Sequence, residues 1–315
     1  MNFADLQAFC TVARSDSLSL AAAELHQTPS ALSKALRRLE AKLGTPLFER
    51  ANKQLKLNRS GRLLLPRALQ LVHFAEQTRS EIAGSDARVH ARIAGPAMLL
   101  WGYGALFCQL LTTRFADSSL IQSAKFEDDA LAALGRGEID FALVTQAVVA
   151  TPGKNWQAHW RADAVGTLRM QLCAGATHAL AAVDKVSATE LLRYDFACPQ
   201  HSMLCGVARG AHSDGWRNDA FPRRIRYWVD DLVLLLMLVR TGAALAYLPE
   251  FALINEPGLR RIEVSDCPYV CEEQVYLVHT PSQALGWQQH LVSEFLQALS
   301  TRNKNVPNFS KTEML

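Results

Sequence analysis

The sequence predicts an α/β protein in which a small, mainly helical domain and a long helix precede a larger domain of alternating strands and helices. Three patterns predict this fold class. Apolar residues recur at helical spacing between capping residues up to about residue 45. A roughly heptad-spaced apolar run begins after Ser60. From Ala91 onward, short strand-like runs alternate with helical patterns, as they do in an α/β sheet.

Composition limits the class of protein. The 315 residues suffice for two or three domains, and 49% hydrophobic with 20% charged residues is ordinary for a soluble globular chain. The N-terminus lacks the layout of a signal peptide, and the longest apolar run, Leu232–Val239, is too short to span a membrane. Seven cysteines without CxxC spacing favour reduced thiols. We therefore expect a cytoplasmic protein with no membrane partner.

Positive charge is concentrated in the N-terminal part. Between Lys34 and Arg67 there are ten Lys or Arg residues against two acids, Glu40 and Glu49. Residues 1–90 carry a formal charge of +5, and the remainder carries −2. The positive field therefore belongs to the N-terminal part rather than to the whole chain.

The first two predicted helices lead into a turn. Asn2 can cap a first helix, whose predicted buried face is Phe3, Leu6, Phe9, Cys10 and Ala13. Ser17 or Ser19 caps a short helix over residues 20–25, and His26-Gln27 forms the turn that follows. A third helix with a cationic face then completes a helix-turn-helix arrangement.

The third predicted helix is the element around which the others are arranged. Thr28 caps it, Pro29 is its first residue, and Gly44-Thr45-Pro46 ends it. Its apolar stripe is Leu32, Leu36, Leu39 and Leu43. Its other face carries hydroxyls and cations, namely Ser30, Ser33, Lys34, Arg37 and Arg38. Such a face can reach base edges and phosphates, although it is also typical of an ordinary solvated helix, so the neighbouring elements decide between the two.

Two short strands are expected next, over residues 47–50 and 55–57. They flank Ala51-Asn52-Lys53-Gln54 and form a wing, with Lys53 and Lys56 near its tip.

With the wing in place, the first 60 residues resemble the DNA-binding domain of the LysR-type transcriptional regulators. The residues that carry the resemblance are Leu6, Phe9, Ser17-Leu18, Ala21-Ala22, Leu25, Ser30-Ala31-Leu32-Ser33-Lys34, Leu39-Glu40, Leu43-Gly44-Thr45-Pro46-Leu47-Phe48-Glu49-Arg50, Leu57-Asn58 and Gly61. The chain departs from the family pattern at Pro29, where Gln is common, at Leu18, where Phe is usual, at Leu20, which is often polar, and at Asn58, where Thr is usual. Pro29 cannot donate a hydrogen bond to a base edge, so its neighbours must carry more of the sequence reading.

A long helix over 59–84 follows the winged domain of residues 1–58. Leu65, Leu69, Val72 and Arg79 repeat at roughly heptad spacing, Leu64, Leu71 and Phe74 widen the stripe, and Pro66 lies close to the start of the helix. The stripe needs a partner, which is either a second copy of the chain or the chain's own winged domain. The resemblance implies a linker helix that mediates dimer contacts, with a hinge at 85–90.

The remaining residues are expected to form an effector-binding domain over 91–300. Segments 135–143 and 238–249 resemble a Gly-x-Leu-Asp strand entry and a helix-Gly-strand-Leu-Pro segment of the family. The resemblance implies a periplasmic-binding-protein-like (type 2) pair of subdomains joined by two crossing strands. We place subdomain I at about 91–166 and 268–300 and subdomain II at about 167–267. The polar tail, 301–315, is expected to be disordered.

The predicted DNA-binding residues follow from the third helix and the wing. Ser30, Ser33, Lys34 and Arg37 are assigned to the major groove, and Thr28, Arg38, Arg50, Lys53 and Lys56 to the DNA backbone or minor groove.

The predicted effector-binding residues lie where strand ends and helix starts meet between the two lobes. They are Ala97, Met98, Leu99, Trp101, Gln146, Gln200, His201, Ser202, Trp228 and Asp230. Met, Leu and Trp at the first of these positions make a simple anion site poor, so a bulkier or partly apolar effector fits better, or no small molecule at all. Ordinary packing at the seam is the competing explanation for each residue.

Other chemistries receive little support. Cys198 and Cys205 could form a redox-sensing pair, or they could be buried structural thiols. No P-loop, HExxH, GxSxG or GxGxxG motif is present, and no two of the nine histidines are spaced i, i+4. No catalytic residue, metal site or cofactor is therefore predicted.

The resemblance implies a sequence-specific transcriptional activator or repressor controlled by a small-molecule co-inducer. Its expected partners are a promoter dyad in double-stranded DNA, further copies of the chain as a homodimer and homotetramer, the effector, and RNA polymerase. A redox-sensing regulator is the first alternative. An α/β metabolic enzyme with an accessory DNA-binding domain is the alternative from another class.

Overall fold

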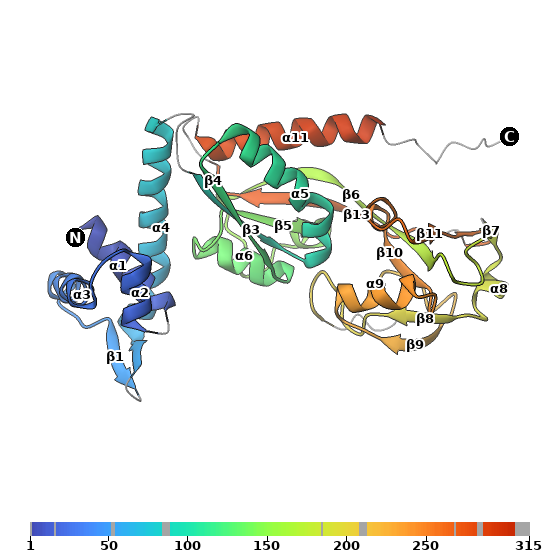
Figure 1. The fold of residues 1–315 in the computed structure, drawn as a ribbon, viewed down its shortest axis with the longest axis horizontal. Helices are drawn as coiled ribbons and strands as arrows, with labels where there is room; N and C mark the ends of the chain where they lie inside the picture. The colour runs from blue at the N-terminus through green and yellow to red at the C-terminus, as the bar shows by residue number, and fades with distance from the viewer. Residues whose placement is uncertain are drawn as a thin grey trace.

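The computed structural model describes residues 2–15, 17–51, 54–83, 89–183, 185–207, 213–267, 269–281 and 286–305. The chain is elongated, with a helical N-terminal domain at one end, a long helix beside it, and two α/β lobes that follow one another toward the other end (Figure 1). The expected fold class is confirmed. None of the helices in the described ranges has the length and apolar character needed to cross a membrane.

The N-terminal domain contains three helices and a two-stranded wing. The helices are α1 (Phe3–Arg14), α2 (Leu18–Glu24) and α3 (Pro29–Leu43), and the wing pairs β1 (Phe48–Ala51) with β2 (Gln54–Leu57) in antiparallel register. Each helix has a side-chain cap, because Asn2, Ser17 and Thr28 accept hydrogen bonds from the backbone N–H groups of Ala4, Leu20 and Ala31. Ser17, rather than Ser19, therefore starts the second helix.

The core of this domain comes from the predicted apolar stripes, with one exception. Leu6 and Phe9 of α1 pack with Leu32 and Leu39 of α3. Leu43, which the stripe predicts as buried, is exposed because it occupies the last turn of α3, immediately before the left-handed residue Gly44. The apolar contact of α3 therefore ends one turn earlier than its pattern.

Helix α4 (Arg59–Ala83) starts against the same core. The Oδ1 atom of Asn58 accepts a hydrogen bond from the N–H of Gly61 at 2.9 Å, so the family departure at Asn58 is a helix cap. A Cβ atom on Gly61 would collide with the carbonyl oxygen of Leu47, so a glycine is required at this close approach. Because α4 lies against α1, the predicted stripe of Leu65, Leu69 and Val72 packs on the chain's own winged domain.

The exposed apolar residues of α4 lie on another face. They are Leu63, Leu71, Phe74 and Ile82. At 100° per residue these four positions fall within a sector of about 100° on the helix surface. The face that remains open for a partner is therefore not centred on the stripe that the heptad pattern predicts.

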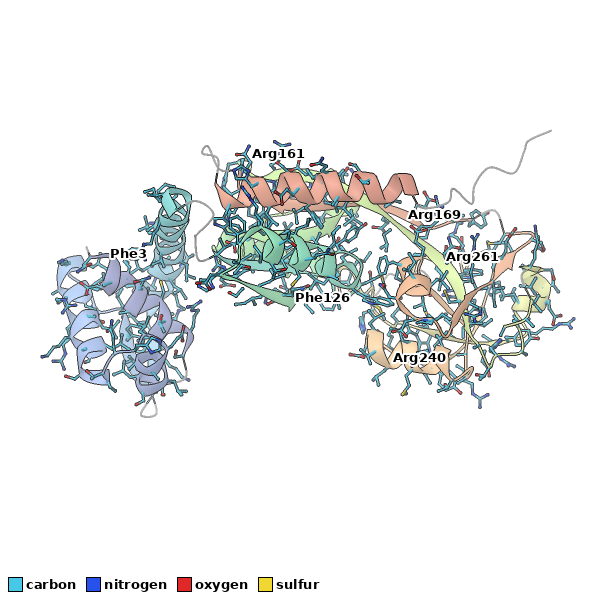
Figure 2. The ribbon with its side chains drawn as sticks, turned by 45° about the horizontal axis from the view of Figure 1, so that its top comes forward. Phe3, Phe126, Arg161, Arg169, Arg240 and Arg261 are labelled. Carbon is cyan, nitrogen blue, oxygen red and sulfur yellow. The ribbon has the colours of Figure 1, made fainter. Side chains whose placement is uncertain are left out.

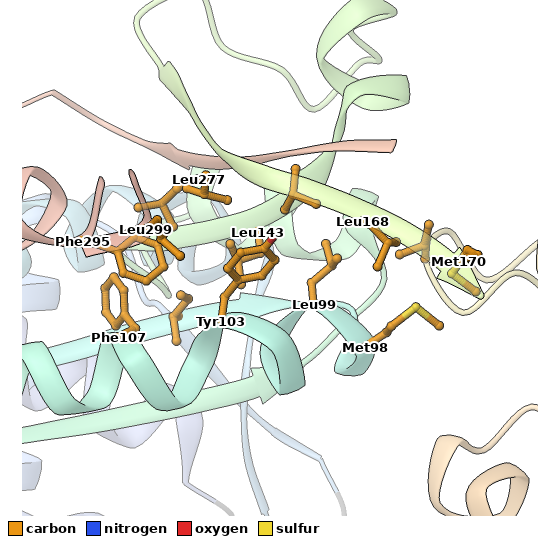
Figure 3. Close-up of a cluster of buried hydrophobic side chains, with 14 of the residues drawn as sticks. Met98, Leu99, Tyr103, Phe107, Leu143, Leu168, Met170, Leu277, Phe295 and Leu299 are labelled. Carbon is orange, nitrogen blue, oxygen red and sulfur yellow. The ribbon is translucent and has the colours of Figure 1, made fainter. Parts of the chain in front are cut away.

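Subdomain I is built on a mixed sheet. Strand β3 (Val89–Gly95) pairs in parallel with β4 (Ser118–Ala124) and β5 (Phe141–Thr145), and β13 (Glu272–His279) pairs antiparallel with β5. The helices of this lobe are α5 (Ala97–Arg114), α6 (Glu127–Gly135), α7 (Gln146–Ala150) and α11 (Trp287–Asn305). The side chain of Phe107 on α5 meets Phe141 of the sheet and Phe295 of α11 at 5.1 and 5.2 Å between ring centroids, which fixes the core in Figure 3.

Two long strands join the lobes. Strand β6 (Arg161–Gly175) pairs with β13 in subdomain I, and its later residues pair with β10 (Ala246–Pro249) and β11 (Leu259–Arg261) in subdomain II. The remaining elements of subdomain II are β7 (Lys185–Val186), α8 (Ala188–Leu191), β8 (Asp195–Cys198), β9 (Arg224–Trp228), α9 (Leu232–Arg240), α10 (Phe251–Asn255) and β12 (Glu263–Val264). The two crossing strands are β6 and β13, as the resemblance implies.

The predicted tail begins too early. Helix α11 continues to Asn305, because the hydroxyls of Ser300 and Thr301 bond to the carbonyl oxygens of Leu296 and Gln297 within the same helix. Residues 306–315 lie outside the described residues.

Candidate DNA-reading helix and interlobe cavity

Helix α3 presents the predicted polar face to solvent. Ser30, Lys34 and Arg37 are exposed, and Ser33 is half-buried. The opposite face is fixed, since Leu32, Leu36 and Leu39 are buried in the domain core. The helix can therefore offer these side chains to a ligand surface without moving.

Arg38 has a structural partner. Its guanidinium lies 2.6 Å from the carboxylate of Asp5, whose side chain is 1% exposed while that of Arg38 is 56% exposed. The pair joins α3 to α1, so Arg38 orients the helix as well as adding positive charge. Glu40 has a related role, because its Oε1 atom accepts the N–H of Leu47 at 2.7 Å and ties the start of the wing to α3.

The wing residues are only partly described. Lys56 is exposed on β2. The backbone of Arg50 lies in β1, but its side chain is outside the described part of the chain, and Lys53 is outside it entirely. The predicted contacts of Arg50 and Lys53 therefore stay predictions.

A small cavity lies between the two lobes. Its volume is about 40 Å³, roughly the room that one to a few water molecules need. Its lining combines α5, the crossing strands, β10, α9 and the loops after β8. The lining residues are Met98, Leu168, Met170, Pro199, Ser202, Met203, Leu204, Ser213, Asp214, Gly215, Leu235, Tyr247, Cys271 and Glu273.

Direct contacts hold the lobes together beside this cavity. The N–H of Glu127 in subdomain I donates to the carbonyl oxygen of Leu204 in subdomain II at 3.1 Å. Phe126, on the side of subdomain I that faces subdomain II, packs against Gly206 (Figure 2). The ring of Trp101 on α5 meets that of Phe251 at 5.4 Å between centroids. The cavity is therefore enclosed by lobes in contact.

Two of the predicted effector residues, Met98 and Ser202, line this cavity. Leu99 does not, because it is one residue further around α5 and is fully buried in the core of subdomain I (Figure 3). Trp101 packs on Phe251, and Ala97 is exposed at the start of α5.

The other predicted effector residues have different partners. Gln146 is hydrogen-bonded to the hydroxyl of Tyr276. The N–H groups of Gln200 and His201 donate to Asp230 at 2.7 and 2.9 Å, and Nδ1 of His201 lies 2.7 Å from the same carboxylate, so these three residues brace a loop. Trp228 lines a separate cavity of about 230 Å³.

Sequence reasoning missed most of the lining. Met170 and Glu273 come from the crossing strands, and Asp214 comes from a loop with no motif of its own. Only Tyr247 had a signal, since it lies in the helix-Gly-strand segment that resembles the family.

A buried ion pair forms the wall behind Asp214. The guanidinium of Arg223 makes two bonds to the Asp214 carboxylate at 2.7 and 3.0 Å, and its Nε donates to Asn218 at 2.9 Å. The thiol of Cys198 donates to Asp214 at 3.5 Å. Burial raises the pKa of Cys198 to about 12, and the charge of Asp214 adds to the effect. Cys198 therefore stays a neutral thiol, the opposite of what a peroxide-reactive cysteine needs.

No group of three or more His, Cys, Asp or Glu side chains that could hold a metal ion occurs among the residues that the structure describes.

Two family models match the chain. The model described as "Bacterial regulatory helix-turn-helix protein, lysR family" matches residues 3–62, and the model described as "LysR substrate binding domain" matches residues 106–303. The second match alone covers more than half of the 315 residues.

Curated relatives match over different lengths. The regulator MetR of Salmonella typhimurium is 28% identical over 260 residues, which cover 78% of this chain and 74% of MetR. ShiR of Corynebacterium glutamicum is 26% identical over 244 residues, covering 76% of this chain and 80% of ShiR. An uncharacterized regulator of Azotobacter vinelandii is 38% identical over 93 residues, and that match covers 30% of this chain and 65% of the relative, less than two thirds of its length.

Solved structures share the fold at low sequence identity. A full-length OxyR variant from Pseudomonas aeruginosa superposes with a TM-score of 0.66 at 16% identity, over 95% of this chain and 94% of that one. CbnR in complex with its target DNA gives a TM-score of 0.59 at 16% identity, over 95% of this chain and 100% of that one. LysG of Corynebacterium glutamicum with bound effector arginine gives 0.57 at 18% identity, over 96% of this chain and 99% of that one. At these identities the comparison speaks for the fold alone.

Proposed function

The chain belongs to the LysR family of bacterial helix-turn-helix regulators, and from that premise we propose that it reads operator DNA with α3 under the control of an effector bound between its lobes. The observation that carries the proposal is the exposed hydroxyl and cationic face of α3, whose opposite face is fixed in the winged domain. CbnR, which shares the fold, is known in a complex with target DNA. A regulator that acts on the chromosome works in the bacterial cytoplasm, which is the location we propose.

Within this proposal the residues of α3 have separate tasks. Ser30, Ser33, Lys34 and Arg37 read base edges, because serine hydroxyls and long cations can bond to them in the major groove. Thr28, at the start of the helix, and Lys56, on the wing, contact phosphates or the minor groove, as do Arg50 and Lys53. Arg38 adds positive charge but is held by Asp5, so we assign it mainly to orienting α3.

The test is binding of the full chain to the DNA upstream of its own gene, measured by fluorescence anisotropy against a scrambled duplex of equal length. Affinity is expected to fall steeply with salt, because each neutralised phosphate contributes about −0.9 to the slope of log K against log salt. Lys34→Ala should reduce that slope, and Lys42→Ala is the matched control, since Lys42 is an exposed lysine in the last turn of the same helix. Absence of specific binding, or of salt dependence, would refute the proposal.

We propose that dimers form through the open apolar face of α4, defined by Leu63, Leu71, Phe74 and Ile82. These side chains are exposed in a single chain, and their burial in a dimer would contribute roughly 1.5–3 kcal/mol for each fully covered side chain. A second copy of α4 offers the same face in a symmetric pair.

A second surface supports a homotetramer. Exposed apolar residues gather on α9, at Val233, Leu234 and Met237, and Ile121 is exposed on β4, which is the last strand in the order of the main sheet. Contact between these surfaces on different copies would join two dimers and place four winged domains on one promoter.

The effector is expected to act by separating the lobes. Because the cavity is only about 40 Å³, an organic ligand cannot enter it while the contacts of Leu204 and Gly206 with subdomain I are intact. Binding would shift the population toward a more open arrangement of the lobes.

The two alternatives fare differently. The enzyme alternative has no support, because both matching models describe one family of regulators. The redox alternative is disfavoured by the neutral, buried thiol of Cys198.

A further inference from the structure

The interlobe cavity has an unusual balance of charge for a site that would hold an organic anion. Two of its lining residues, Asp214 and Glu273, are carboxylates, and none of the described lining residues is Lys, Arg or His. An anion buried in such a place would lose its hydration without gaining a counter-charge, which is costly.

The nearest cations are engaged elsewhere. Arg223 lies behind Asp214, is fully buried, and spends its guanidinium on Asp214 and Asn218. Arg169 alternates along β6 with the lining residues Leu168 and Met170, so it points to the other face of the strand, where it pairs with Glu272 at 2.6 Å. The Asp214–Arg223 pair is neutral as a unit, and Glu273 therefore leaves the lining with a net negative charge.

The rest of the lining is apolar or accepts hydrogen bonds. Methionine thioethers from three elements, Met98, Met170 and Met203, can adapt to an apolar body of irregular shape. The hydroxyl of Ser213 donates to the carbonyl oxygen of Gln200 at 3.0 Å, so its own oxygen can still accept a hydrogen bond. Pro96, the N-cap of α5, offers no side-chain hydrogen bond at the end of the helix beside Met98.

We propose that the effector of this protein is an apolar amine, a ligand with a hydrophobic body and a protonated nitrogen that Glu273 recognises, and that carboxylates of the same shape are rejected. This proposal rests on the proposed function, because it assumes that the interlobe cavity is the effector site. The amine supplies the positive charge that the lining lacks, and its N–H groups match the acceptor oxygens of Glu273 and Ser213.

The test uses matched probes and the full-length protein in isothermal titration calorimetry at neutral pH. Three sets are compared: 2-phenylethylamine, 2-phenylethanol and 3-phenylpropanoate; hexylamine, hexanol and heptanoate; cyclohexylmethylamine, cyclohexylmethanol and cyclohexylacetate. In at least one set the amine should bind about tenfold or more tighter than the acid, with the alcohol between them. Glu273→Gln should reduce the amine-to-alcohol ratio to about threefold or less and leave alcohol binding unchanged, which a merely structural role would not do.

Two further variants separate the possible failures. Met203→Trp fills the cavity and should abolish binding of all probes. Arg209→Ala removes a cation outside the described residues and should leave the amine preference unchanged. Acids that bind more tightly than amines, and are lost in Met203→Trp, would overturn the amine proposal while the interlobe effector site stands. Amines that still bind to Met203→Trp would overturn the site itself, and a failure of every amine to bind would overturn the proposed ligand class.

Discussion

The buried Asp214–Arg223 pair gives a sharp prediction about stability, because both side chains are almost completely removed from water. Arg223 is 0% and Asp214 3% exposed, and the guanidinium makes two short bonds to the carboxylate. We consider three variants: Arg223→Met, which leaves the carboxylate alone; Arg223→Lys, which keeps the charge without the planar fork; and Arg223→Met combined with Asp214→Leu.

The expected losses differ in size. Removing one partner of a buried ion pair costs about 3–5 kcal/mol, because the remaining charge is buried without compensation. Arg223→Met also removes the bonds to Asn218 and to the sulfur of Cys198, so the upper part of this range is expected. Arg223→Lys should lose about 1–3 kcal/mol, since an ammonium cannot replace the bidentate contact. The double variant should be more stable than Arg223→Met, because no buried charge is left.

The assay is urea unfolding of the full chain followed by tryptophan fluorescence, because Trp216 lies 5.3 Å from the Arg223 guanidinium. Hydrogen exchange of peptides covering β8 and β9 assigns the change to subdomain II. Asp214→Leu alone completes the double-mutant cycle, and a coupling free energy of about 3 kcal/mol is expected. If the double variant loses as much stability as the two single variants added together, the reasoning about the pair is refuted.

Three further predictions concern other regions. Ser33→Ala and Arg37→Ala should each lower the ratio of operator to nonspecific DNA affinity, by about tenfold for a lost bidentate contact, more than they lower nonspecific affinity. Anisotropy with both duplexes measures this, and an unchanged ratio in both variants would show that another face of α3 reads the DNA. Phe74→Asp should shift the protein toward monomers in sedimentation velocity, whereas Arg79→Asp, on a different face of α4, should not. An unaltered mass for Phe74→Asp would exclude the proposed face. Finally, burial raises the pKa of Cys198 from an ordinary value of 9.0 to about 12, so the unfolded chain ionises first as pH rises. The stability due to the neutral thiol is then complete below pH 9 and is lost toward pH 12, and a melting curve that falls equally steeply in Cys198→Ala would contradict this.

Local chemistry made the winged domain readable from the sequence. Asn2, Thr28 and Pro29 mark helix starts that depend only on neighbouring backbone groups, and Gly44 marks an end that needs a left-handed residue. The stripe of α3 was confirmed up to Leu39, because an amphipathic helix with one covered face is recorded in its spacing.

Tertiary pairing could not be read in the same way. The heptad stripe of α4 predicted a surface but not its occupant, and the winged domain covers Leu65 and Leu69 before any second copy can. The wall of the cavity likewise brings together Met98, Asp214 and Glu273, which are far apart in the sequence and carry no shared motif. Such juxtapositions depend on how β6 and β13 cross, and a single sequence does not record that path.

The proposed assembly gives the interlobe angle a direct route to the DNA. Ile121 belongs to subdomain I and the exposed face of α9 belongs to subdomain II, so any change in the angle between the lobes moves these two surfaces relative to each other. In a single chain that movement has no consequence for α3, whose position depends on α1 and α4. In a tetramer that uses both surfaces, the same movement changes the distance between dimers, and with it the spacing of the DNA-reading helices. An effector that separates the lobes would therefore act on promoter geometry rather than on the affinity of one winged domain, because the contacts that hold α3 do not include the effector domain.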